Sequence, residues 1–81
     1  MRVTNCYYDG CNGQRTSESF EGSVEECAEF LVACDTDEDT GESCNGWTVE
    51  SAVESLLEAQ STGEPVYIDY EGDMQNWLVV S

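Results

Sequence analysis

The feature that most constrains this chain is an acidic run at residues 35–42, with the sequence DTDEDTGE. It holds five carboxylates in eight residues, and no Lys or Arg lies near it. The segments on both sides have the periodicity of amphipathic helices, so the run is expected to connect two helices next to the core. It is therefore either a calcium-binding loop or the densest part of a negative surface that meets a positive partner.

The charge of the whole chain is equally one-sided. Its 81 residues include 18 Asp and Glu, 2 Arg, no Lys and no His, which gives a formal net charge of -16. A hydrophobic content of 40% is too high for a disordered acidic tail, so residues 1–81 are expected to fold as a single domain. Such a polyanion repels nucleic acid and anionic membranes and attracts basic protein surfaces, so direct DNA or RNA binding is not expected.

Both ends of the chain have the pattern of β-hairpins. Strands are predicted at residues 2–8 and 14–20, joined by a turn that contains Asp-Gly and Asn-Gly. The second of these strands has only Phe20 as a strongly apolar residue, which favours a position at the edge of the sheet. Residues 66–70 and 74–80 are predicted to form the other hairpin.

The first helix is predicted to begin after Ser23 and to end near Cys34 or Asp35. Ser23 and Glu26 have the spacing of a capping box, in which each side chain caps the backbone of the other. Cysteine and aliphatic residues then recur at helical spacing, which predicts one buried face. Cys27 and Cys34 lie on this face, where a thiol behaves as a small apolar group.

The second helix is predicted to begin after the N-cap residue Thr48 and to end before Gly63 and Pro65. Its apolar stripe repeats at i, i+3, i+4, i+7 and i+8. The stripe consists of Val49, Ala52, Val53, Leu56 and Leu57. The element order is then ββααββ, which predicts an α+β fold: a four-stranded, mainly antiparallel sheet with two helices packed on one face.

No catalytic or metal-binding motif stands out, and no enzyme activity or cofactor is expected. The common general bases and amine nucleophiles are missing because the chain has no His and no Lys. The five cysteines contain no Cys-x-x-Cys pair, so a zinc site would need an unusual spacing. The N-terminal residues have no apolar signal segment, which predicts a cytoplasmic protein with mostly reduced thiols.

A degenerate calcium loop remains one alternative for the acidic run. Asp35, Asp37 and Asp39 occupy positions 1, 3 and 5 of an EF-hand-like loop. The glycine expected at position 6 is replaced by Thr40, and the bidentate glutamate expected at position 12 is replaced by Gly46. This pattern predicts weak, generic cation binding.

The favoured site is a negative surface formed by both helices and the run between them. Successive glutamates on the second helix are four residues apart, which places them about 6 Å apart along its axis. Fixed charges at such a spacing resemble a phosphate backbone to a protein that holds DNA or RNA electrostatically. The candidate partner-binding residues are Glu25, Glu26, Glu29, Asp35, Asp37, Glu38, Asp39, Glu42, Glu50, Glu54 and Glu58.

In these carboxylates and its short, Lys-free single domain, the chain resembles, at class level, small anti-defence proteins of phages and mobile elements. That class includes anti-CRISPR and antirestriction proteins, and many members mimic DNA. The resemblance implies an inhibitor of a basic nucleic-acid-binding protein, such as a CRISPR effector complex or a restriction enzyme in a prokaryotic host. The candidate aromatic anchors for such a partner are Tyr7, Tyr8, Tyr67 and Trp77.

A halophile-adapted acidic interaction domain is the other alternative. Its acidic surface would serve solubility and stability in high cytoplasmic salt. Two features weigh slightly against it: Glu outnumbers Asp by 12 to 6, and five cysteines is a large number for so short a chain.

Overall fold

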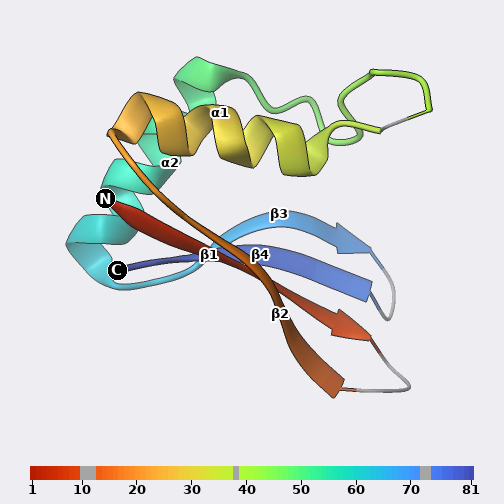
Figure 1. Cartoon of the computed structure of the whole chain (residues 1–81), viewed down its shortest axis with the longest axis horizontal. Helices are drawn as coiled ribbons and strands as arrows, with labels where there is room; N and C mark the ends of the chain where they lie inside the picture. Colours follow the sequence, from red (N-terminus) through yellow and green to blue (C-terminus); the bar gives the residue numbers. More distant parts are fainter. Residues whose placement is uncertain (10–12, 38, 72–73) are drawn as a thin grey trace.

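The computed structural model describes residues 1–9, 13–37, 39–71 and 74–81. The elements follow in the order ββααββ (Figure 1). They are β1 (Arg2–Asp9), β2 (Gly13–Glu21), α1 (Val24–Asp35), α2 (Val49–Thr62), β3 (Val66–Glu71) and β4 (Met74–Val80). The predicted element order is confirmed, and the bounds differ from the predicted ones by only one or two residues.

The four strands form one antiparallel sheet in the order β2-β1-β4-β3. The first and last strands of the chain pair in its centre, with Val3 opposite Val80. Backbone hydrogen bonds between Arg2 and Ser81 of 3.1 and 2.8 Å continue this pairing to the end of the chain. The polar strand β2 lies at the edge, as its composition predicts.

Both helices begin at the predicted caps. The backbone N–H of Glu26 donates to Ser23 Oγ at 3.2 Å, and the Ser23 N–H donates to Glu26 Oε1 at 3.1 Å, which completes a capping box. Thr48 and Ser51 form the equivalent box on α2. That helix ends at Gly63, whose φ of 78° lies in the left-handed region that favours glycine.

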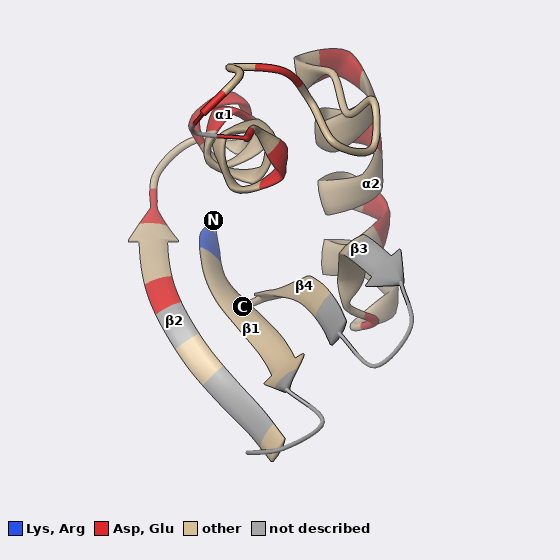
Figure 2. Cartoon of the chain, turned by 90° about the vertical axis from the view of Figure 1, so that its right-hand side faces the viewer, with Lys and Arg blue, Asp and Glu red and all other residues tan. Residues whose placement is uncertain are grey.

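The core lies between the helices and one face of the sheet (Figure 2). Val3 and Leu78 contribute to it from the central strands, and Leu31 and Leu56 from the two helices, all with no exposed surface. Cys27 is also fully buried, and Cys34 packs against this cluster from a half-buried position. The fold is therefore the predicted α+β arrangement. The buried face of α2 is narrower than the predicted stripe, because Ala52 and Leu56 are buried whereas Val49 and Leu57 are exposed.

An irregularity in β3 links the sheet to the start of α2. Tyr67 pairs with Trp77 and Asp69 pairs with Asn76, so Ile68 is an extra residue in the β3 strand. The backbone carbonyl of Ile68 accepts a hydrogen bond of 3.2 Å from the indole N–H of Trp47. This contact fixes Trp47, which lies immediately before α2, against the edge strand.

The sheet face opposite the helices carries Cys6, Trp77 and Tyr67 in one row across β1, β4 and β3. The rings of Tyr67 and Trp77 are tilted by 46°, with centroids 6.2 Å apart. Within the described ranges, neither helix has the length and apolar character needed to cross a membrane.

Candidate acidic surface and adjoining pocket

The three glutamates of α1 lie on the side of the helix that faces away from the core. Glu25 and Glu29 are exposed, whereas Cys27, Ala28 and Leu31 on the opposite side are buried. Glu26 is also exposed, but one of its carboxylate oxygens accepts the hydrogen bond from Ser23 that caps the helix. Glu26 therefore contributes charge to the surface and also stabilises the start of α1.

The acidic residues of α2 are arranged in the same way. Glu50, Glu54 and Glu58 are exposed, and the buried residues Ala52 and Leu56 lie on the other side of the helix. Glu50 lies in the first turn, where a negative charge interacts favourably with the helix dipole. Figure 2 shows acidic residues distributed along both helices and the segment between them.

The acidic run itself folds into a small hairpin rather than an open loop. Thr36 and Ser43 form an isolated antiparallel bridge. Inside it, the Asp37 N–H donates to the Glu42 carbonyl at 2.9 Å, and the Gly41 N–H donates to the Asp37 carbonyl at 2.7 Å. The turn requires a left-handed conformation at Gly41, where φ is 73°. Figure 1 shows this hairpin projecting beyond the end of α1.

Asp35 differs from the other candidate residues because it is only 3% exposed. Its Oδ2 accepts a hydrogen bond from the Ser43 hydroxyl and longer ones, of 3.3 Å, from the backbone N–H groups of Asn45 and Trp47. Its Oδ1 accepts from the Asn45 side-chain amide at 2.7 Å. The expectation that Asp35 belongs to the exposed surface is corrected here: its carboxylate faces inward and organises the segment between the helices.

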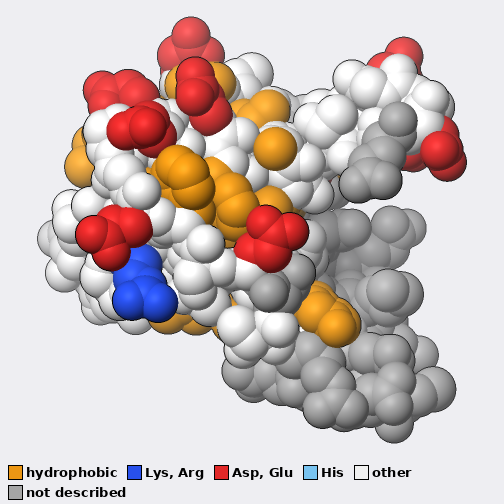
Figure 3. Space-filling model, in the orientation of Figure 1, with side chains coloured by type: hydrophobic (Ala, Val, Ile, Leu, Met, Phe, Trp, Pro, Cys, Tyr) orange, Lys and Arg blue, Asp and Glu red, His pale blue; other side chains and the backbone are white. Residues whose placement is uncertain are grey.

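The remaining acidic residues of the run are exposed. Asp37, Asp39 and Glu42 lie in the hairpin, and Asp37 also accepts a 2.8 Å hydrogen bond from the Asp39 N–H. Glu38 lies outside the described residues. In Figure 3, acidic side chains lie over the helices and, separately, on the projecting hairpin, with other surface between them. In this view the acidic residues therefore form two separate groups rather than the single surface expected from the sequence.

The geometry of the run does not favour the calcium alternative. Asp35, which would provide the first ligand of an EF-hand-like loop, directs both of its oxygens to hydrogen-bond donors of residues 43–47. Among the residues that the structure describes, no three His, Cys, Asp or Glu side chains are grouped so that they could hold a metal ion.

The cysteines for which the structure gives positions are dispersed through the fold. Cys6 and Cys27 are buried free thiols, and Cys34 is a half-buried one. Burial raises the pKa of Cys27 above its ordinary value. Burial also raises the pKa of Cys34, and the carboxylate of Glu18 adds to this effect. A high pKa disfavours the reactive thiolate, so these two residues have the character of core residues. Cys44 is exposed, and Cys11 lies outside the described residues.

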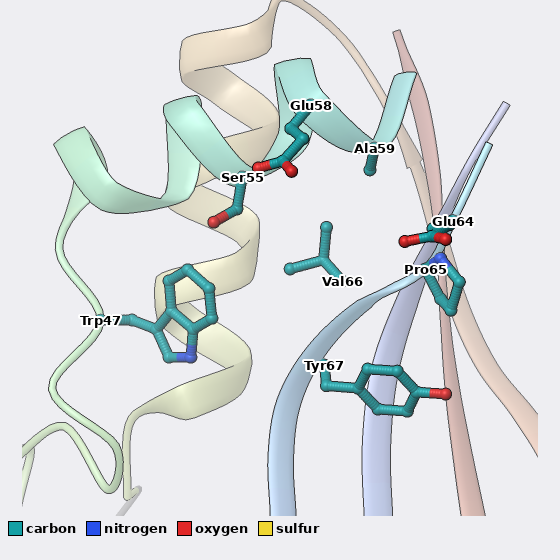
Figure 4. Close-up of a pocket in the computed structure, with 8 residues that line it drawn as sticks. All are labelled: Trp47, Ser55, Glu58, Ala59, Glu64, Pro65, Val66 and Tyr67. Atoms are coloured by element: carbon teal, nitrogen blue, oxygen red, sulfur yellow. The ribbon is translucent and has the colours of Figure 1, made fainter. Parts of the chain in front are cut away.

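A pocket that sequence reasoning did not identify adjoins the acidic surface. It lies between the C-terminal half of α2 and the start of β3, has a volume of about 240 Å³, and is open to solvent (Figure 4). We call it the α2–β3 pocket. Its lining residues are Trp47, Ser55, Glu58, Ala59, Glu64, Pro65, Val66 and Tyr67. The stripe of glutamates on α2 predicted Glu58 as a site residue. The spacing of residues in the sequence did not predict that Glu58, Glu64 and Trp47 line the same pocket.

The four candidate aromatic anchors differ in position. Tyr7 and Tyr8 are exposed on β1, and Tyr67 is exposed on β3 to the extent of 50%. Trp77 is half-buried beside Tyr67 on the open face of the sheet. Of the four, Tyr67 is the one that also lines the α2–β3 pocket, which it shares with Glu58 of α2.

Comparison of the chain with protein-family models, curated proteins and solved structures finds no match.

Proposed function

We propose that this protein is a non-enzymatic inhibitor that binds a basic, nucleic-acid-binding surface of another protein and competes with DNA or RNA there. The observation that carries the proposal is the exposure of the acidic residues on a folded scaffold. Of the eleven candidate carboxylates, Asp35 is buried and Glu38 lies outside the described residues, and the other nine are exposed. The whole chain has only two basic side chains to offset them.

The physical basis is electrostatic. Like charges one helical turn apart repel each other, and no Lys alternates with Glu50, Glu54 and Glu58 to offset that repulsion. A basic partner surface relieves the repulsion and is attracted from a distance, which increases the association rate. A groove that binds nucleic acid has this character, because it is lined with Lys and Arg that contact phosphates.

The proposed partner is a bacterial or archaeal nucleic-acid-binding effector, such as a CRISPR effector complex or a restriction enzyme. The class-level resemblance to anti-defence proteins supports this choice, and the surface would then act in the cytoplasm of the host cell. The projecting hairpin and the helices offer two separate sets of charges, which suits a partner with an extended basic channel.

A capture experiment tests the proposal. The immobilised protein is incubated with lysate of a prokaryotic host, and bound proteins are eluted with increasing duplex DNA or RNA. We expect nucleic-acid-binding proteins to be retained and then released by nucleic acid, with retention falling steeply as salt rises, because screening weakens such contacts. If excess nucleic acid released none of the bound proteins, the proposed competition would be excluded.

Two variants with the same change in charge sharpen the test. Glu50→Gln with Glu54→Gln neutralises two positions on α2, whereas Glu18→Gln with Glu21→Gln neutralises two exposed positions on β2. We expect the α2 variant to lose retention and the β2 variant to keep it. Equal losses would indicate that net charge, rather than this surface, determines binding. A halophile-adapted domain would instead unfold near physiological salt, which circular dichroism detects.

A further inference from the structure

The α2–β3 pocket combines negative charge with aromatic and apolar walls. Glu58 comes from α2, and Glu64 comes from the connection that follows the helix. Figure 4 shows the two carboxylates on opposite sides of the hollow, with Val66 between them. The residues that line it include no basic side chain, so nothing in the lining neutralises the two carboxylates.

The aromatic side of the pocket is held in place by the sheet. The hydrogen bond from the Trp47 indole to the Ile68 carbonyl, 3.2 Å long, fixes the ring beside the hollow. Tyr67 lines the hollow from β3, and the contact of its ring with Trp77 constrains that ring. Figure 4 shows both rings beneath the two carboxylates in that view. The rings therefore do not have to be ordered when a ligand binds, which lowers the cost of binding.

The chemistry of the lining selects a flat organic cation. Two carboxylates favour a positive ligand, and aromatic rings attract cations through the negative charge of their faces. A guanidinium satisfies both requirements, because its fork of N–H donors pairs with carboxylates and its plane stacks on rings. A volume of about 240 Å³ is below the roughly 300–1,000 Å³ typical of small-molecule sites. It therefore suits one side chain better than a cofactor.

We infer that the α2–β3 pocket binds a single arginine side chain of the partner protein, with Glu58 and Glu64 pairing with the guanidinium and Tyr67 contacting its plane. The inference rests on the proposed function for the identity of the partner as a basic protein. It adds a defined anchoring point to a surface that otherwise acts through dispersed charge. In that role the two carboxylates occupy the place that a phosphate group occupies for an arginine in a nucleic-acid-binding groove.

The test uses a small probe, N-acetyl-arginine amide, with N-acetyl-citrulline amide as its neutral analogue of nearly the same shape. Binding is followed by NMR through the indole N–H of Trp47 and the backbone N–H of Val66. We expect saturable shifts at these two positions with the arginine probe and none with the citrulline probe. Shifts spread evenly over all exposed carboxylate-bearing segments would overturn the inference, because they indicate a diffuse ion atmosphere.

Matched variants assign the binding to the pocket. Glu58→Gln with Glu64→Gln should weaken the binding of the arginine probe by about fivefold, because each exposed ion pair contributes only modestly. Glu18→Gln with Glu21→Gln changes the net charge by the same amount, but on the opposite edge strand. This variant should weaken the binding of the arginine probe by less than about twofold. Tyr67→Leu provides a third variant with unchanged charge, and we expect about threefold weaker binding from the lost ring contact. Equal effects of the two charge variants would refute the assignment.

The outcome is separable from that of the proposed function. If the arginine probe does not bind in the pocket while nucleic acid still releases captured proteins, the inhibitor proposal stands without this anchor. If the probe binds in the pocket and no captured protein responds to nucleic acid, the pocket stands and the proposed competition fails.

Discussion

The side-chain amide of Asn45 donates a 2.7 Å hydrogen bond to Oδ1 of Asp35, ten positions earlier in the sequence. This contact closes the segment that carries the acidic hairpin, and the backbone of Trp47 joins it through Oδ2. The buried carboxylate of Asp35 thus fixes the conformation of the segment that carries the most negative stretch of the chain.

Replacing Asp35 should therefore destabilise the fold rather than weaken a surface. Asp35→Ala leaves the N–H groups of Asn45 and Trp47 without their acceptor, and we expect a loss of about 3 kcal/mol in the free energy of unfolding. Asp39→Ala, in the exposed hairpin, should change it by no more than about 0.5 kcal/mol. Urea unfolding followed by circular dichroism measures both. Similar values for the two variants would mean that the Asp35 contacts contribute little.

Trp47 gives a second stability prediction. Trp47→Phe keeps an aromatic ring and removes the N–H that donates to Ile68, so we expect a loss of about 1 kcal/mol. Trp77→Phe is the matched change on the open face of the sheet, where the ring contacts Tyr67. It should lower the free energy of unfolding by less than Trp47→Phe does. A larger effect at Trp77 in the same urea experiment would contradict the role assigned to the indole hydrogen bond.

Adjacent leucines on α2 test which side of the helix faces the core. Leu56 has no exposed surface, whereas Leu57 is 48% exposed. Leu56→Ala removes buried volume and should lower the free energy of unfolding by about 2–5 kcal/mol. Leu57→Ala should lower it by about 1 kcal/mol or less. Thermal unfolding of the two variants provides the comparison, and comparable melting temperatures would show that the helix is rotated relative to the structure described.

These cases show why the fold could be predicted and parts of the site could not. Capping boxes, apolar periodicity and turn residues are local patterns, and they predicted both helices, all four strands and the edge position of β2. The burial of Asp35 depends on donors of residues 43–47 that only the folded chain brings together. Composition alone therefore placed Asp35 with the exposed residues that share its charge.

The α2–β3 pocket escaped prediction for a related reason. One of its walls is Trp47, whose indole donates to the carbonyl of Ile68, the extra residue in β3. A bulge of this kind leaves little trace in the alternation of a six-residue strand. Glu58 and Glu64 then line opposite sides of the hollow at the C-terminal end of α2. The acidic hairpin likewise depends on the antiparallel bridge of Thr36 and Ser43 and on the hydrogen bonds that Asp37 and Cys44 donate to the carbonyls of Glu42 and Asp35, which the charge pattern does not encode.

The cysteines predict a decrease in stability at high pH. The pKa values of Cys27 and Cys34 are raised in the folded protein, so their thiols ionise at a lower pH in the unfolded chain. The stability that these two buried thiols contribute to the folded protein is fully present below the ordinary thiol pKa of about 8.5 and is lost as the pH rises above it. Cys27→Ala with Cys34→Ala should show a smaller decrease between neutral pH and alkaline pH in urea titrations. An unchanged decrease would assign the pH dependence to groups other than these two thiols.

Divalent cations should stabilise the protein without distinguishing calcium from magnesium. Both ions screen the repulsion among exposed carboxylates, so equal concentrations should raise the melting temperature by similar amounts. A calcium loop would discriminate between them, because it provides more oxygen ligands at longer distances than Mg²⁺ accepts. Asp37→Asn with Asp39→Asn should reduce the response no more than Glu18→Gln with Glu21→Gln, which removes the same charge from β2. A calcium-specific increase that disappears only in the Asp37 and Asp39 variant would restore the cation-binding interpretation of the acidic run.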